Sequence, residues 1–274
     1  MTTTTVTDSQ GLCTGWEPDL PAEDTVLRRF LLHQSEYFAS AAAAGGGTTV
    51  RDAGMAVADL GRPSGFFNSA VLLQPPAPDR WDGVLDSLDE AFAHGSGDTH
   101  LWSAWPTPDL RPRGWQLMGH PPLLVRPPGG VLPPAAPGLE VGEVRTPAGL
   151  EDWARVAVEG YPLDELSPYR PGSLLDERIL RDRRWRFWVG YEDGRPVSIG
   201  TLFVSHGLAE LALGVTLPQA RGRGFWSALV RERLRAEPDL LSGGVFSDDS
   251  RPGIQRLGYL PVVRLTLWHR TRRP

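Results

Sequence analysis

The chain of 274 residues has no lysine, a single cysteine and no long apolar run. The lone Cys13 cannot form an intramolecular disulfide, which is typical of a protein from a reducing, intracellular compartment. Without lysine there is no Walker phosphate loop, because that motif needs GxxxxGK followed by Ser or Thr. The start, MTTTTVTDSQ, lacks the basic and apolar segments of a signal peptide. We therefore expect a cytoplasmic protein without a membrane partner.

The charges and the composition exclude further classes of protein. All 28 basic residues are arginines, spread along a chain that has 33 acidic residues and a formal net charge of -5. Nucleic-acid-binding domains gather positive charge on one face, so we expect no nucleic-acid partner. No His/Cys cluster has metal-ligand spacing, and no metal site is predicted. The remaining composition, 41% hydrophobic and 22% charged, is that of a globular protein.

A segment rich in proline and glycine divides the chain. RPPGGVLPPAAPG, at 126–138, contains five prolines and three glycines and cannot sustain a helix or a sheet ladder. Residues 1–15 are polar and Thr-rich, which is typical of a disordered tail. We therefore predict a tail at 1–15, a first domain at 16–126, a linker at 127–138 and a second domain at 139–274.

Hydrophobic patterns predict alternating strands and helices on both sides of this linker. In the first half we expect a helix at 24–44, a strand that ends at 72, a helix at 81–92 and a strand at 121–126. In the second half we expect strands at 139–144, 187–191, 197–205, 209–215, 245–246 and 262–269, and helices at 147–159, 174–181, near 254 and at 225–236. The strand ends at Leu72 and Val215 precede Gly114 and Gly258 by nearly equal distances, and an aromatic residue follows each of these glycines. This similarity indicates an internal repeat.

The stretch Gly214–Val230, GVTLPQARGRGFWSALV, predicts a strand, a glycine-containing loop and the start of a helix. Backbone N–H groups at a helix N-terminus lack intrahelical partners, and the helix dipole adds positive charge, so this corner suits a phosphate. Gly222 and Gly224 would let a pyrophosphate approach these amides, and Arg221 and Arg223 add charge there. The spacing does not fit the dinucleotide motif GxGxxG, because Ser227 stands at its last position.

This loop resembles that of the GNAT superfamily, the GCN5-related N-acetyltransferases. QARGRG, at 219–224, matches the family's pyrophosphate motif Q/RxxGxG/A, and SDDSRPGIQRLGY, at 247–259, resembles its later segment with a Gly-aromatic pair. The resemblance covers about 139–270. It implies an α/β (α+β) fold of two GNAT-like domains, as in tandem GNAT proteins of actinobacterial type. Each would be a mixed, mostly antiparallel sheet flanked by helices, the first one shortened.

The resemblance also implies acetyl-CoA as co-substrate and an amine of a small molecule or protein as acceptor. The implied cofactor-binding residues are Val215, Thr216, Leu217, Arg221, Gly222, Arg223, Gly224, Phe225 and Trp226. The first half has LLQPPAPDRW at the matching corner, with three prolines that offer no N–H. We therefore expect one cofactor per chain and a degenerate first half, which either lines the acceptor cleft of the second half or only stabilises it.

Catalysis needs a base, because a free alkylamine is mostly protonated at neutral pH. Glu210 is the candidate, since strand alternation places it on one face with Ala212 and Gly214, whose small side chains leave room. The alternative for Glu210 is a strand-edge carboxylate in water. Many family members place a proton-donating tyrosine where this chain has Ile254. Ser250 is either a substitute donor or a helix cap.

Further choices stay open from the sequence. Glu159 and Tyr161 either line an acceptor site or belong to an ordinary loop. The protein is either an acetyltransferase or a non-catalytic acyl-CoA-binding or scaffold protein, as the loss of the tyrosine suggests. The acceptor, the acyl-chain preference and the oligomeric state, a homodimer included, cannot be derived from these residues.

Overall fold

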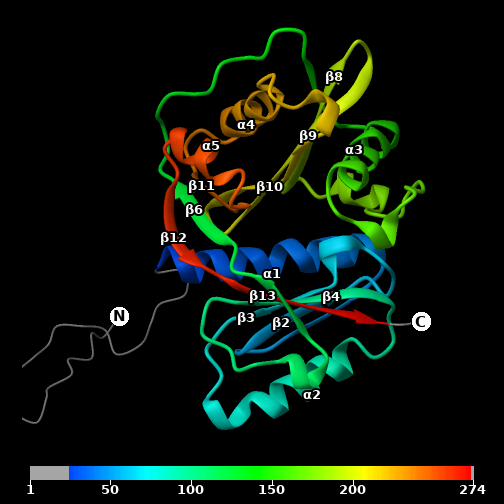
Figure 1. The fold of residues 1–274 in the computed structure, drawn as a ribbon, viewed down its shortest axis with the longest axis vertical. Coiled ribbons are helices and arrows are strands. Elements are labelled where there is room, and N and C mark those ends of the chain that lie inside the picture. Colours follow the sequence, from blue (N-terminus) through cyan, green and yellow to red (C-terminus); the bar gives the residue numbers. More distant parts are fainter. Residues whose placement is uncertain (1–24, 273–274) are drawn as a thin grey trace, which may run out of the picture.

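The computed structural model describes residues 25–272, which form two β-sheets with α-helices around them (Figure 1). The helices are α1 (Val26–Gly45), α2 (Trp81–Ala91), α3 (Pro147–Gly160), α4 (Phe225–Ala236) and α5 (Arg251–Arg256). The expected fold class is confirmed: the protein is α+β, and both sheets are mixed and mostly antiparallel. The predicted tail at 1–15 and Cys13 lie outside the described residues.

The first sheet has the strand order β1-β2-β3-β4-β13-β5. Its strands are β1 (Thr48–Arg51), β2 (Met55–Asp59), β3 (Ser69–Leu72), β4 (Gly97–Ser103), β5 (Gln116–Gly119) and β13 (Thr266–Arg272). Neighbours are antiparallel except β3 and β4, which are parallel and joined by α2. A parallel pair needs such a crossover, because a tight turn can only reverse the chain.

The second sheet has the order β12-β6-β11-β10-β9-β8-β7. Its strands are β6 (Pro122–Arg126), β7 (Glu140–Glu143), β8 (Trp185–Glu192), β9 (Arg195–Ser205), β10 (Leu208–Thr216), β11 (Leu241–Val245) and β12 (Leu260–Arg264). Again one pair is parallel, β10 with β11, and α4 is its crossover. In each sheet, two further strands lie beyond the parallel pair and its crossover helix, and this shared arrangement agrees with the internal repeat that the sequence indicates.

The two halves of the chain exchange a strand. β6 precedes the Pro/Gly-rich segment but lies in the second sheet between β11 and β12, whereas β13, at the end of the described chain, lies in the first sheet between β4 and β5. The prediction of one last strand at 262–269 is therefore wrong. The chain forms two strands on either side of Leu265, which is buried, and each strand pairs in a different sheet. The division at 127–138 stays a prediction, and the sheets do not follow it.

A second correction concerns the helix predicted at 174–181. The structure has only a 3₁₀ turn at Glu177–Arg181, while Leu174 and Leu175 are buried ahead of it. Leucines at consecutive positions both contribute to the core here, so the apolar pattern reflects an irregular segment that packs inward rather than a helical face.

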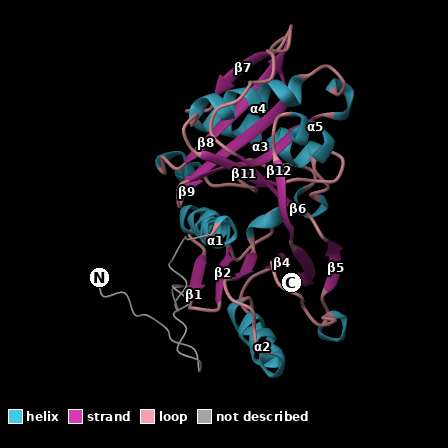
Figure 2. Cartoon of the chain, turned by 90° about the vertical axis from the view of Figure 1, so that its left-hand side faces the viewer, coloured by secondary structure: helices cyan, strands magenta, loops and turns pink. Residues whose placement is uncertain are grey.

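Helix α1 is sandwiched between the two sheets (Figures 1 and 2). Its N-cap is Thr25, whose hydroxyl accepts from the N–H of Arg28 at 3.1 Å. On the side of the second sheet, Tyr37 lies 4.6 Å from the ring of Trp185, and the Trp185 indole donates to Ser40 at 2.8 Å. Because α1 contacts strands of both sheets, one helix contributes to the packing of both layers.

The other helices complete the layers. α3 covers the same face of the second sheet as α1, α4 and α5 cover its opposite face, and α2 covers the outer face of the first sheet. The predicted helices α1, α2, α3 and α4 are confirmed, since each apolar stripe packs on a sheet.

An ion pair fixes the exchanged strand β13 in the first sheet. Arg272 donates two hydrogen bonds to Asp59 at the end of β2, each 2.9 Å long, and the two side chains are 9% and 6% exposed. Such a bidentate pair compensates the desolvation of both charges only while both partners are present.

A candidate cofactor cleft between β10 and β11

The second sheet opens where β10 and β11 separate. They pair only from Leu208 to Glu210 of β10, opposite Leu241 to Gly243 of β11, although β10 continues to Thr216. A cavity of about 780 Å³ fills the opening, within the range of small-molecule sites. Its lining is Gly160, Tyr161, Pro162, Leu211, Leu213, Gly214, Val215, Thr216, Arg221, Trp226, Arg233, Val245, Phe246, Ser247, Asp249, Ser250, Pro252, Gly253 and Arg256.

A β-bulge accompanies this separation. The pairing of β10 with β9 shifts between Ala212 and Val215, and Leu213 adopts φ +41°, a conformation uncommon for leucine. A bulge bends its strand, so the outer part of β10 departs from β11 while it stays paired with β9. The far edge of β10 is thereby left without a strand partner along the cavity.

The predicted phosphate loop leads from this edge into α4. Gly222 and Gly224 have φ +76° and +80°, the left-handed region that glycine adopts without strain. Gly224 is the N-cap of α4, and no side chain caps the helix, so the first N–H groups lack protein partners of that kind. A Cβ at Gly222 would meet no atom within 4 Å, so the space beside this residue is open.

The two arginines of the loop differ in their surroundings. Arg223 donates two hydrogen bonds to Glu192 at the end of β8, and its guanidinium lies 4.6 Å from the centre of the Phe225 ring. Arg221 lines the cavity and donates to the carbonyl of Thr216 at 3.0 Å. Arg221 therefore remains the loop cation that faces the opening, while the charge of Arg223 is paired.

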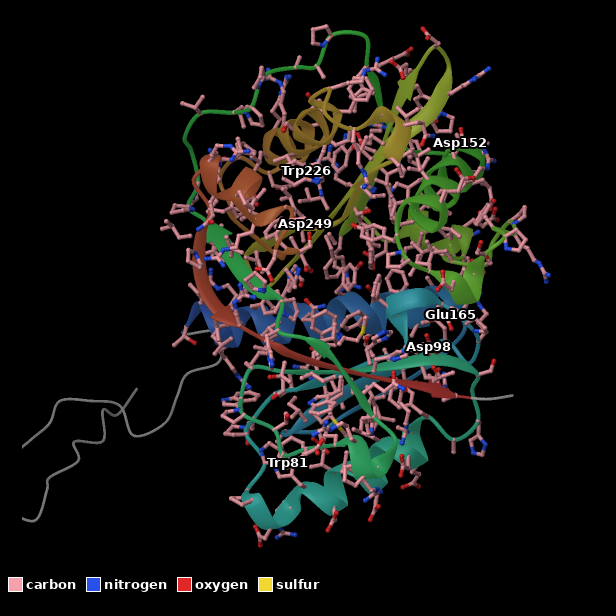
Figure 3. The ribbon with its side chains drawn as sticks, viewed as in Figure 1. Trp81, Asp98, Asp152, Glu165, Trp226 and Asp249 are labelled. Atoms are coloured by element: carbon pink, nitrogen blue, oxygen red, sulfur yellow. The ribbon has the colours of Figure 1, made fainter. Side chains whose placement is uncertain are left out.

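The structure brings most of the predicted cofactor residues together. Four of them line the cavity: Val215, Thr216, Arg221 and Trp226. Arg223 and Gly224 line an adjacent hollow of about 350 Å³, whose other wall is the segment 133–137. Leu217 and Phe225 are buried, so only their backbone groups can meet a ligand. Figure 3 shows Trp226 at the start of α4, with Asp249 nearby on the other side of the cleft.

Glu210 lies at the apex of the opening but points toward α1. It is 4% exposed, and its Oε2 is 3.1 Å from Nε2 of His33. The other ring nitrogen of His33 is 2.8 Å from the hydroxyl of Ser205. The alternative of a strand-edge carboxylate in water is therefore wrong. The cavity lining begins at the next residue, Leu211, and the role of Glu210 as base stays a prediction.

Tyr161 is the more prominent of the two polar residues at the end of α3. Its hydroxyl donates to the carbonyl of Gly214 in the bulge at 3.1 Å, and burial raises its pKa to about 12. Glu159 is exposed. Ile254, at the position of the family's tyrosine, is fully buried in the core and offers no donor. Ser250 lines the cavity, and its hydroxyl donates to the carbonyl of Ser247 at 3.0 Å.

Sequence reasoning missed Arg233, which lies on α4 and is 2% exposed. Its guanidinium donates to three carbonyls, those of Leu229 at 3.0 Å, Ala212 at 3.2 Å and Thr201 at 3.4 Å. Burial lowers its pKa to about 10, so it remains charged at neutral pH. The spacing offered a signal, because Arg233 falls three and four residues after Val230 and Leu229, on the apolar stripe of the helix.

The matching corner of the first sheet is built differently. β3 pairs with β4 as far as Val71, one residue before β3 ends, so these strands do not separate. Prolines at 75, 76 and 78 then lead into α2, which begins at Trp81 (Figure 3). Neither the open strand edge nor the glycine loop of the second sheet is present there.

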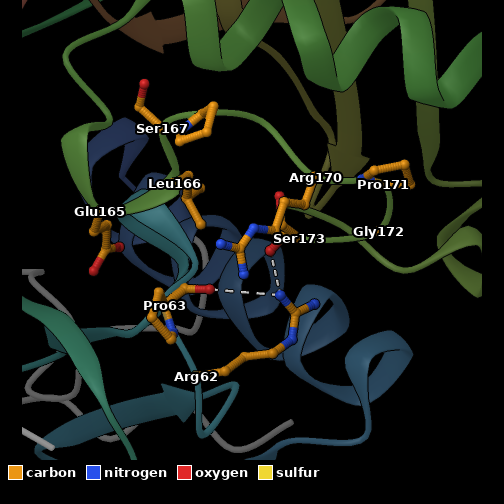
Figure 4. Close-up of a pocket in the computed structure, with 10 residues that line it drawn as sticks. Arg62, Pro63, Glu165, Leu166, Ser167, Arg170, Pro171, Gly172 and Ser173 are labelled. Atoms are coloured by element: carbon orange, nitrogen blue, oxygen red, sulfur yellow. Dashed lines mark hydrogen bonds between the residues drawn. The ribbon is translucent and has the colours of Figure 1, made fainter.

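A second cavity, of about 450 Å³, lies between residues 62–63 and the segment 165–173 (Figure 4). Its polar groups serve mainly to join these segments. Glu165 accepts from the N–H groups of Ser64, Gly65 and Asp98, and burial raises its pKa. Arg62 donates to the carbonyl of Ser173.

The described residues contain neither a cluster of metal ligands nor a helix that could span a membrane. Between 25 and 272 there is no group of three or more His, Cys, Asp or Glu side chains arranged to hold a metal ion. In the same range no helix combines the length and the hydropathy of a membrane span.

Comparison with known proteins identifies the fold. No family model matches the chain, and no curated protein sequence does. Among solved structures, a GCN5-related N-acetyltransferase from Kribbella flavida is 20% identical with a TM-score of 0.60, over 87% of this chain and 96% of that one. A GCN5-related N-acetyltransferase-like protein from Streptococcus suis is 15% identical with a TM-score of 0.52, over 88% and 100%. The chain therefore has a GNAT fold over most of its length.

Proposed function

We propose that the protein is an acetyl-CoA-dependent N-acetyltransferase that transfers the acetyl group to an amine by direct attack on the thioester. The observation that supports this most is the continuous path from the open edge of β10 to the uncapped start of α4. An extended chain with an anionic end fits it, since strand edges bind extended chains and helix N-termini bind phosphates.

Each part of acetyl-CoA has a complementary group in this path. The N–H groups at Gly222 to Trp226 would hold the pyrophosphate, with Arg221 beside them. The free edge at the end of β10 and the residue after it, from Val215 to Leu217, would hydrogen-bond the pantetheine, as in the family that the fold resembles. The thioester would then lie deeper, near the bulge and Tyr161.

The acceptor nitrogen must lose a proton before or during attack. Glu210 is the candidate base, at the apex where β10 and β11 part. His33 holds its carboxylate in place, and His33 belongs to α1, so the first half of the chain would contribute to the site. Because Glu210 does not line the cavity, the proton would reach it through water at the apex.

We further infer that the first half is a degenerate GNAT-like unit and that one chain binds one acetyl-CoA. The undivided β3/β4 pair and the prolines after it support this. Acetyl-CoA as co-substrate is consistent with a cytoplasmic location, and an amine of a small molecule or a protein would be the acceptor.

A second candidate is a non-catalytic acyl-CoA-binding or scaffold protein. It is favoured by Ile254, which cannot donate a proton, and by Glu210, which does not line the cavity. The two functions differ in turnover and not in binding.

Calorimetry with acetyl-CoA, followed by an acetyl-transfer assay over a panel of amines, tests both. We expect binding with one site per chain and acetylation of at least one amine. Binding without turnover over the whole panel would favour the second candidate, and the lack of any binding at millimolar acetyl-CoA would overturn both.

A further inference from the structure

The guanidinium of Arg233 is a buried cation that has no anionic partner among residues 25–272. It lines the cavity, and the titratable groups of the described chain that act on its charge are the phenols of Tyr161 and Tyr259, with no carboxylate among them. Its Nε and Nη1 donate hydrogen bonds, and all three acceptors are backbone carbonyls. Nη2 takes part in none of these hydrogen bonds. It lies beside the bulge, 3.0 Å from the position that a Cβ of Gly214 would occupy.

The sheet is shaped to admit this group. A Cβ at Gly200 of β9 would lie 2.7 Å from Nε of Arg233, and one at Gly214 would also be too close. Glycines in two neighbouring strands thus leave the room that the guanidinium occupies. A buried charge is costly unless it is paired, so a cation kept in this position is expected to meet an anion that arrives with a ligand.

The reaction proposed above generates such an anion in this cavity. When the amine nitrogen forms its bond to the thioester carbon, the C–S bond breaks and its electron pair remains on the sulfur of coenzyme A. The usual proton donor is replaced by Ile254, and the phenol of Tyr161, with a pKa of about 12, is a far weaker acid than a thiol. The thiolate therefore needs a counter-charge rather than a proton.

We propose that Arg233 stabilises the thiolate of coenzyme A as the leaving group, by charge and hydrogen bonding without proton transfer. This inference depends on the proposed function. The guanidinium stays protonated throughout, the proton of the attacking amine goes to the base, and the thiolate takes a proton from water after release.

The test is the thiol pKa of bound coenzyme A, measured by the ultraviolet absorbance of the thiolate during a pH titration of the complex. A cation at close range lowers the pKa of an acidic group by about 1–3 units. We expect the bound thiol to titrate at least about one unit lower in the wild type than in Arg233→Met. Arg233→Lys should keep most of the shift, and Arg235→Met, on the exposed side of α4, should behave as the wild type.

Gly200→Ala provides a second variant, because its methyl group displaces the guanidinium without removing the charge. It should raise the pKa of the bound thiol as Arg233→Met does. If Arg233→Met does not fold, the thiol pKa in Gly200→Ala tests the role of Arg233. In an active enzyme both variants should lower kcat more than they raise KM for acetyl-CoA.

Calorimetry separates this inference from the proposed function. If the wild type does not bind coenzyme A, the proposed function fails. If all variants bind it and the thiol pKa is the same in each, only the role of Arg233 fails. A strong preference for acyl-CoA donors with a terminal carboxylate, lost in Arg233→Met, would also overturn it, since Arg233 would then recognise the acyl group.

Discussion

Replacing Gly222 by asparagine should weaken acetyl-CoA binding roughly 100-fold and leave the fold intact. Gly61 provides the matched control, because the two glycines share the same local situation: φ is +76° at Gly222 and +73° at Gly61, and an added Cβ meets nothing within 4 Å at either. Only Gly222 lies on the loop before α4. Any difference between the two variants therefore reports on the ligand rather than on the backbone.

The magnitudes follow from the two environments. An L-residue in the left-handed region costs roughly 1–2 kcal/mol, and asparagine tolerates it best, so both variants should lose at most that much stability. At Gly222, three residues before α4 begins, we expect the new side chain to compete with a pyrophosphate for the space at the first N–H groups of the helix. A hydrogen bond to a charged group contributes about 1.5–3 kcal/mol, so the loss of two to a pyrophosphate weakens binding by at least about 3 kcal/mol, or roughly 100-fold.

Calorimetry with acetyl-CoA measures the affinity, and thermal unfolding measures the fold. We expect equal melting temperatures for Gly222→Asn and Gly61→Asn, with binding reduced only in the first. Unchanged affinity in Gly222→Asn would refute the assignment of the loop as the pyrophosphate site.

Three further predictions concern the base, the exchanged strand and the first sheet. Glu210→Gln should lower kcat by a factor of about 10² to 10⁴ and retain the affinity for acetyl-CoA. The control Glu159→Gln should change neither quantity. Equal kcat values in the two variants would exclude Glu210 as the base. Asp59→Asn should reduce the free energy of unfolding in urea by about 3–5 kcal/mol, because it leaves the buried charge of Arg272 unpaired, and a loss below about 1 kcal/mol would contradict this. Burial lowers the pKa of His100 to about 4, against about 6.5 in the unfolded chain. As the pH drops from 6.5 to 4, the unfolded state takes up the proton first, so the free energy of unfolding falls by up to about 3 kcal/mol. His100→Gln should make the free energy of unfolding depend less on pH in this range.

Elements that depend on local pattern could be predicted from the sequence. The sequence predicts the helix Phe225–Ala236 with the bounds that the structure shows, because an apolar stripe and a glycine at its start define it locally. The strand exchange could not be predicted in the same way. LPVVRLTLW is one apolar run, and the break at Leu265 depends on which strands, far away in the sequence, pair with each side of it.

In the candidate site too, local patterns predict some residues, and contacts between distant parts of the chain determine the others. The loop at 219–224 could be found because its glycines and its position before a helix are encoded in consecutive residues. The contact of His33 with Glu210 joins residues from the two halves of the chain, so no local pattern indicates it. The burial of Arg233 is not expected from its charge, because arginines are mostly exposed, although its position on the helix indicates burial.

A crystal structure of the protein soaked or grown with acetyl-CoA tests the central claim most directly. The account predicts the pyrophosphate at the N–H groups of Phe225 and Trp226 and the pantetheine between β10 and β11. Coenzyme A bound elsewhere, or the same opening filled by protein side chains at saturating ligand, would contradict it.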